Sequence, residues 1–197
     1  MLTDIRWRMW TAVAVQFLVL LALIGVKQYT LLSGTPVRLE TVPVDPRDLF
    51  RGDYVVLDYR ISDLDLSGLD SDESRPFEEH DTVFVVLRPD GEYWTAAGAY
   101  HARPPVDAGQ VVLRGEVEYT LEFRVAGESS IRVKYGIESY FVPEGSGWAI
   151  EQIRGRGLGA EVVVDRFGNG VVRRLLVDGQ PLDVAVPGVV QPGRPSA

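Results

Sequence analysis

The stretch Asp53–Ile61, which reads DYVVLDYRI, alternates two kinds of residue. One set is apolar or aromatic and comprises Val55, Leu57, Tyr59 and Ile61. The set between them comprises Tyr54, Val56, Asp58 and Arg60. Successive side chains of a β-strand point to opposite faces, so this pattern predicts a half-buried strand. We therefore expect Leu57 and Tyr59 in the core and Tyr54 at the surface.

Further short β-rich runs follow along the chain, and turn residues separate them. The predicted strands are residues 37–42, 82–87, 93–100, one or two strands within 110–123 with a break near Gly115, 131–135, 138–142, 160–165 and 171–177. Two hairpins are expected around Pro89-Asp90-Gly91 and Phe167-Gly168-Asn169-Gly170. Only 149–154 suggests a helical turn. The fold class predicted is mainly β, an antiparallel β-barrel or sandwich behind a single transmembrane helix.

An uncharged segment of 18 residues, Met9–Val26, precedes the β-rich region. As a helix it would span about 27 Å, close to the roughly 30 Å of a bilayer's hydrocarbon core. It is apolar on every face except at Gln16, which is unlike a buried amphipathic helix. No small-x-small cleavage site follows it, unlike a secretory signal peptide. The segment therefore predicts an uncleaved transmembrane signal anchor.

The chain divides into five segments on this basis. We expect a cytoplasmic N-terminus at 1–8, the anchor at 9–29, a stalk at 30–36, an extracytoplasmic β-rich domain at 37–186 and a disordered tail at 187–197. Arg6 and Arg8 make the N-terminal flank positive, which favours a cytoplasmic N-terminus. The C-terminal domain would then lie outside.

The charge and the cysteine content of the chain argue against several classes of function. Beyond Lys27 the chain carries 27 acidic against 17 basic residues, a net charge of −10. Such a surface repels phosphate backbones, so nucleic-acid binding is disfavoured. The chain has no cysteine, which excludes disulfides, thiolate metal sites and cysteine nucleophiles. No cofactor is expected.

Two motifs carry a resemblance to a known family. Gly52–Tyr59 reads GDYVVLDY, and Tyr135–Gly145 reads YGIESYFVPEG. Together with the VDPRDLFR approach and a closing LLVDGQPL, they resemble the GDYXXLXY family of membrane-anchored bacterial proteins over roughly Pro36 to Leu182. The resemblance implies a place in the bacterial cytoplasmic membrane with the domain outside. Because such proteins are often encoded beside multi-spanning membrane proteins, it also implies an integral membrane partner, but it supplies no activity.

Candidate binding residues lie in and around the two motifs. They are Arg47, Phe50, Arg51, Asp53, Tyr54, Glu138, Tyr140 and Glu144. Aromatic and arginine side chains are the usual anchors of interfaces, so we expect a partner surface formed by residues 45–54 and 140–145. The competing interpretation places Phe50 in the core and leaves the arginines solvated. For the octapeptide as a whole, a structural role is favoured over chemistry.

Catalytic and metal-binding alternatives stay open beside the binding module. An envelope enzyme could use Asp53 and Glu138 on polysaccharide or peptide, since paired carboxylates can do acid–base work. A signal-peptidase-like mechanism lacks a suitably placed serine and lysine. His80 and His101 could bind zinc together with Glu78, Glu79 or Asp81, but their spacing fits no familiar pattern and loop histidines are expected. The favoured function is non-catalytic.

An acidic stretch begins like a calcium loop and then departs from it. Asp63, Asp65 and Ser67 occupy the first, third and fifth ligand positions, and Gly68 the sixth. Ser74 stands where a bidentate glutamate is needed. A calcium-responsive module is therefore the second alternative, and we expect a solvated acidic loop with no calcium requirement.

Overall fold

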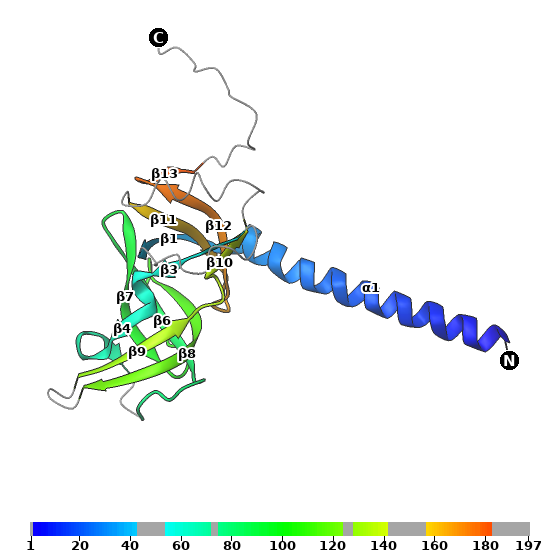
Figure 1. Ribbon diagram of the computed structural model, residues 1–197, viewed down its shortest axis with the longest axis horizontal. Helices are drawn as coiled ribbons and strands as arrows, with labels where there is room; N and C mark the ends of the chain where they lie inside the picture. Colours follow the sequence, from blue (N-terminus) through cyan, green and yellow to red (C-terminus); the bar gives the residue numbers. More distant parts are fainter. Residues whose placement is uncertain (1, 43–53, 72–74, 124–127, 142–156, 183–197) are drawn as a thin grey trace, which may run out of the picture.

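The computed structural model describes residues 2–42, 54–71, 75–123, 128–141 and 157–182. A single long helix projects from a β-domain (Figure 1). This helix, α1 (Leu2–Ser33), is 32 residues long, and the first strand, β1 (Thr35–Val42), begins two positions after it. Residues 30–36 were expected to form a stalk. They comprise the end of α1, one glycine and the first two residues of β1.

Helix α1 is the one described helix that is long and apolar enough to cross a membrane, over Trp7–Ser33. None of its most apolar stretch is buried against the rest of the chain. At 1.5 Å per residue, the 27 residues of this segment reach about 40 Å. The predicted apolar helix is confirmed, and it extends beyond the expected limits of 9–29 at both ends.

Two larger sheets and one small sheet make up the β-domain. The five-stranded sheet has the order β13-β12-β11-β1-β3. Besides β1 it contains β3 (Asp58–Tyr59), β11 (Leu158–Val164), β12 (Gly170–Val177) and β13 (Gln180–Pro181). The six-stranded sheet has the order β4-β9-β8-β6-β7-β5. Its strands are β4 (Asp63–Asp65), β5 (Asp70–Ser71), β6 (Thr82–Asp90), β7 (Tyr93–Tyr100), β8 (Val111–Phe123) and β9 (Glu128–Lys134).

The small sheet pairs β2 (Tyr54–Val56) with β10 (Ser139–Phe141). Two 3-10 turns, η1 (Arg60–Ser62) and η2 (Leu66–Gly68), interrupt the strands between β3 and β5. Among the described strands every pairing is antiparallel except that of β5 with β7. The sheets curl into a half-barrel, which confirms the predicted mainly β, antiparallel class.

The core takes buried residues from both larger sheets, and Tyr140 of the small sheet packs against it partly buried. The largest of its fully buried side chains include Leu39, Tyr59, Val83, Leu87, Leu113 and Leu175. Leu57 and Tyr59 are 2% and 0% exposed, whereas Val56, which belongs to the alternate set of residues, is 52% exposed. The predicted faces of Leu57 and Tyr59 are therefore confirmed.

The predicted strand Asp53–Ile61 is nevertheless divided. Strand β2 pairs with β10, whereas β3 pairs with β1, so the chain changes partner at Leu57. Ile61 remains buried, although it lies in η1 and not in a strand. Alternation in sequence reports which face is buried, and it does not report which strand is the neighbour.

Both predicted hairpins are present. Strands β6 and β7 pair around Gly91, which has a φ of +63°, and β11 and β12 pair around a turn at residues 165–169. Strand β8 is continuous through Gly115, and its irregularity lies between Val117 and Tyr119. The expected helical turn at 149–154 and the expected disordered tail at 187–197 lie outside the described residues.

Candidate functional site

The described parts of the two sequence motifs lie beside each other in the fold. Strand β2, from the octapeptide, pairs with β10, from the second motif, in the register Tyr54 to Phe141 and Val56 to Ser139. Immediately after this ladder the Leu57 N–H donates to the carbonyl of Glu138 over 2.7 Å. Segments about 80 residues apart in the chain are thereby joined along their backbones.

Two buried tyrosines reinforce this junction reciprocally. The Tyr59 hydroxyl donates to the carbonyl of Ile137 at 2.8 Å, and the Tyr135 hydroxyl donates to the carbonyl of Ile61 at 2.6 Å. Burial, with a smaller contribution from the charge of Glu138, raises the pKa of both hydroxyls well above the ordinary tyrosine value. Both therefore remain neutral donors, and each satisfies a carbonyl that would otherwise be unpaired in the interior.

Glu138 is hydrogen-bonded within its own turn. Its Oε1 accepts a hydrogen bond from the Tyr135 N–H at 2.5 Å, across a turn in which Gly136 has a φ of +74°. A carboxylate that closes its own turn is already hydrogen-bonded on one oxygen. In the described residues Glu138 thus stabilises the turn between β9 and β10.

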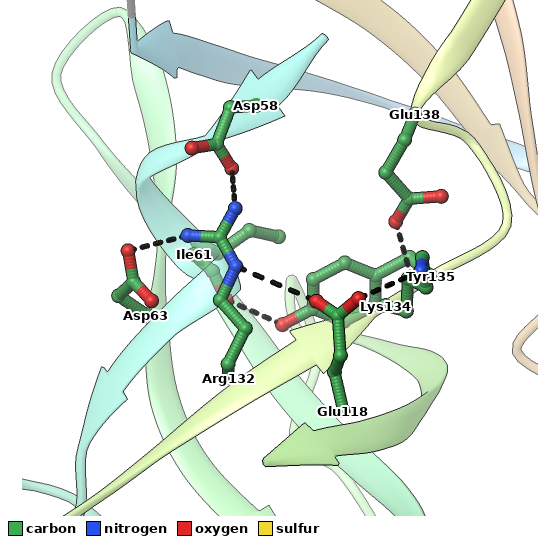
Figure 2. A network of polar contacts seen from close by, with 8 residues as sticks. All are labelled: Asp58, Ile61, Asp63, Glu118, Arg132, Lys134, Tyr135 and Glu138. Atoms are coloured by element: carbon green, nitrogen blue, oxygen red, sulfur yellow. Dashed lines mark hydrogen bonds and ion pairs between the residues drawn. The ribbon is translucent and has the colours of Figure 1, made fainter. Parts of the chain in front are cut away.

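Arg132 organises a set of charged groups beside the paired motifs (Figure 2). Its guanidinium contacts Asp58 Oδ1 at 2.7 Å and Asp63 Oδ2 at 2.6 Å, and its Nε lies 3.9 Å from Glu118. Lys134 pairs with the same glutamate at 2.7 Å. These bonds tie β3, β4, β8 and β9 together, so the polar cluster joins strands and leaves its cationic groups paired.

The predicted binding residues fall into two groups. Arg47, Phe50, Arg51, Asp53 and Glu144 lie outside the described residues, and Tyr54 is described only by its place in β2. Glu138 and Tyr140 lie at the junction of the motifs, and Tyr140 is half-buried against the core.

The calcium candidates are engaged by protein groups. Asp63 pairs with Arg132, and Asp65 accepts hydrogen bonds from the N–H and the hydroxyl of Ser67 at 3.0 and 2.7 Å. The Ser67 bonds lower the pKa of Asp65. Asp65 thus caps η2, and Ser74 lies outside the described residues.

The two histidines occupy different surroundings. His80 Nδ1 lies 3.0 Å from Glu116 Oε1, and that hydrogen bond raises the pKa of the exposed imidazole. His101 stacks on Phe77 with ring centroids 4.0 Å apart, and its Nε2 is 3.8 Å from Asp81. Within the ranges that the structure describes, no three or more histidine, cysteine, aspartate or glutamate side chains are placed to hold a metal ion.

A second junction, between the helix and the domain, has no counterpart among the predicted site residues. The Thr30 hydroxyl, at the end of α1, donates to Asp165 Oδ2 at 2.8 Å, and both residues are buried. Asp165 Oδ1 also accepts from the N–H groups of Phe167 and Asn169 at 2.8 and 2.9 Å. Burial alone would raise the pKa of Asp165, but the bonds from Asn169, Thr30 and Phe167 outweigh it and lower the pKa.

Gly34 allows this second junction to form. A β-carbon at Gly34 would lie 2.6 Å from Val163 Cγ1 and 2.8 Å from the carbonyl of Val164, so a larger residue would push α1 away from β11. The available sequence signal was an aspartate two residues before the Phe167-Gly168-Asn169-Gly170 turn, where aspartate commonly caps a turn through its side chain. Nothing in the sequence pattern connects that turn to Thr30.

The fold and these junctions define a class: a β-domain fixed to the end of one apolar N-terminal helix and closed by two paired motifs. The family model described as GDYXXLXY protein matches residues 16–175, and the chain belongs to this family. The family has no assigned activity. No curated protein and no solved structure gave a significant match.

Proposed function

We propose that this chain is a single-pass protein of the bacterial cytoplasmic membrane that holds its β-domain at the outer face and binds an integral membrane protein there. One observation carries the proposal: a predominantly apolar helical segment of 27 residues, exposed throughout its most apolar stretch, leads into the β-domain across one glycine. Such a surface is stable in lipid and costly in water.

The orientation follows from charge. Arg6 and Arg8 precede the apolar run, whereas Lys27 alone follows it closely. Positive residues are retained on the cytoplasmic side, so the N-terminus would be inside and the β-domain outside.

The buried contact between α1 and the domain supports an assembly role rather than a flexible tether. Thr30 and Asp165 are hydrogen-bonded and buried, and Gly34 packs against β11. A domain held this way has a set height and rotation relative to the bilayer. A fixed orientation suits a protein that must present one surface to a neighbour in the same membrane.

A polar residue within the helix supports a partner in the bilayer. Gln16 lies near the middle of the uncharged run and is exposed. A glutamine amide in hydrocarbon gains by hydrogen-bonding across to another helix. We therefore place a helix of the partner against the face that contains Gln16, Leu20 and Ala12, which are one turn apart.

Topology can be tested cleanly because the chain has no cysteine. Thr3→Cys would carry one label site near the N-terminus. Thr120→Cys would carry one at an exposed position of β8. A membrane-impermeant maleimide added to spheroplasts should label position 120 at once and position 3 only after lysis. Labelling in the opposite order would overturn the proposed orientation.

The partner can be tested with a photo-crosslinking amino acid placed at Leu20 and, as the matched control, at Leu18 on the opposite side of the helix. Both positions are exposed, at 49% and 69%. We expect a discrete adduct with a multi-spanning protein from position 20, lost with Gln16→Leu. Equal adducts from both positions, unchanged by Gln16→Leu, would contradict a specific helix contact.

A further inference from the structure

An aromatic and cationic cluster surrounds the point where α1 meets the β-domain. Arg166 lies over the rings of Phe167 and Tyr29, with its Cζ 4.7 and 5.9 Å from their centroids. Phe167 is 55% exposed and Tyr29 is 43% exposed. We call Tyr29, Arg166 and Phe167 the juxtamembrane cluster. It joins the last turns of the helix to the turn between β11 and β12.

The cluster is held in place by the buried junction beneath it. Asp165 precedes Arg166 directly and binds Thr30 of the helix at 2.8 Å, while its other oxygen accepts from the Phe167 N–H. The turn at 165–169 therefore has a set position relative to the helix. Figure 1 shows α1 entering the β-domain beside β12, with its other end far from every strand.

The depth of the cluster follows from helix geometry. The uncharged run ends at Val26, and Tyr29 is three residues further, or about 4.5 Å along the axis. This is the headgroup layer, where aromatic rings with one apolar and one wet side are most stable. Leu32, one turn beyond, is 78% exposed and extends the apolar surface.

The cation suits the same environment. Within the described ranges Arg166 makes no ion pair with a carboxylate, and its guanidinium is stacked on rings. Stacking uses the faces of the guanidinium and leaves its edge donors available, and phosphate accepts those donors well. An anionic membrane surface repels a domain of net charge −10, so a cation at the contact point offsets part of that repulsion.

We propose that the juxtamembrane cluster is a lipid-binding surface: Phe167 inserts into the headgroup layer, and Arg166 binds a lipid phosphate. The inference rests on the proposed membrane anchor, and it adds that the β-domain itself touches the bilayer through the turn at 165–169. The domain would then lie against the membrane at that turn instead of standing clear of it.

Depth-dependent quenching tests the proposal on the purified full-length protein in proteoliposomes that contain no other protein. A small fluorophore is attached to a single cysteine at Phe167, at Leu18 in the helix or at exposed Thr120, the control. Thr120 belongs to β8, whose end lies on the side of the domain away from the helix (Figure 1). Lipids carry a nitroxide either on the headgroup or deep in the acyl chain.

We expect the headgroup nitroxide to quench the probe at position 167 about twofold, because that probe would lie in the headgroup layer, and to leave position 120 unchanged. The deep nitroxide should quench position 18. Quenching at 18 with position 167 as bright as position 120 would overturn the lipid contact and leave the anchor standing. It would also leave the cluster free for a protein partner. No quenching at 18 would overturn the anchor and the lipid contact together.

Arg166→Gln separates the phosphate contact from simple insertion. In vesicles with anionic lipid, quenching at position 167 should exceed that in zwitterionic vesicles for wild-type Arg166, and the excess should disappear with Arg166→Gln. Arg88→Gln, an exposed arginine on β6, is the matched control and should leave the excess unchanged. An equal excess in the Arg166→Gln protein would show that Arg166 does not bind the lipid phosphate.

Discussion

Strand β1 connects two junctions that are built from different chemistry. At its start Thr35 pairs with Val164, beside the buried contact of Thr30 with the Asp165 carboxylate. At its end Thr41 pairs with Tyr59, whose neutral hydroxyl bonds a backbone carbonyl. The first junction depends on a carboxylate that accepts several hydrogen bonds. The second depends on neutral tyrosine hydroxyls that donate to backbone carbonyls. Only the second is marked by a conspicuous sequence motif.

The two junctions show that a segment can be important in the structure without being conspicuous in the sequence. The octapeptide is prominent, yet its described part closes the domain and binds its own second motif. The helix junction has no motif, yet it determines how the domain sits on α1. The following changes weaken one junction at a time.

Removing a core side chain from the octapeptide should have the largest effect. Leu57→Ala or Tyr59→Ala should lower the free energy of unfolding by about 2–5 kcal/mol, because each truncation leaves a cavity in a packed core. Leu57 and Tyr59 are 2% and 0% exposed. Thermal and denaturant melts of the full-length protein in detergent measure the loss. An unchanged melting temperature for both variants would refute the core assignment.

Asp165→Ala should weaken the helix junction by about 1.5–3 kcal/mol, because it leaves the donors of Thr30, Phe167 and Asn169 without their charged acceptor. Asp70→Ala, an exposed aspartate in β5, serves as the control and should have little effect. The same melts apply. Equal stability of the two variants would mean that the carboxylate does not hold the junction.

The sequence predicted the faces of strands better than their partners. Leu57 and Tyr59 were assigned correctly because alternation reflects burial directly, and both hairpins followed from their turn residues. The division of Asp53–Ile61 between β10 and β1 was not predictable, since pairing depends on strands far away in the chain. The contact between the end of α1 and the domain was not predictable for a related reason: Thr30 and Asp165 are 135 positions apart, and no sequence pattern connects them.

The candidate site was predicted only in part. The sequence indicated that the two motifs matter, and the structure places β2 against β10. The sequence did not indicate that Glu138 closes its own turn or that Tyr135 and Tyr59 form hydrogen bonds across the motifs. Those contacts depend on side-chain direction within a turn that Gly136 shapes with a positive φ.

Removing one hydroxyl from the reciprocal pair should cost less than removing a whole ring. Tyr59→Phe or Tyr135→Phe should lower stability by about 1–2 kcal/mol, because each leaves a buried carbonyl without a donor. Tyr119→Phe, an exposed tyrosine on β8, is the control. A loss no greater than that of Tyr119→Phe would show that these hydrogen bonds contribute nothing net.

The two junctions should respond to pH in opposite directions. The pKa of Asp165 is lowered in the folded state, so its contribution is present above the ordinary aspartate value and is lost on acidification. The pKa values of Tyr59 and Tyr135 are raised, so their contribution is present below about pH 10 and is lost as pH rises further. Each group can change stability by at most about 1.4 kcal/mol per pH unit.

Melts from pH 3 to 11 measure these slopes. Asp165→Asn should flatten the acid limb and leave the alkaline limb unchanged, whereas Tyr59→Phe should do the reverse. Both variants flattening the same limb would contradict the proposed division between a charged and a neutral junction.

The smallest effect is expected for Tyr54, the tyrosine of the octapeptide that was assigned to the surface. Residues two apart in a strand share a face, and Val56, two positions after Tyr54, is 52% exposed. Tyr54→Ala should therefore change the free energy of unfolding by no more than about 0.5 kcal/mol, as is usual for surface substitutions. Melts beside Leu57→Ala decide this, and a loss as large as that of Leu57→Ala would reverse the assigned faces. If Tyr54→Ala folds normally but loses the crosslink to a membrane partner, the octapeptide combines a closing function in Leu57 and Tyr59 with a binding function in Tyr54.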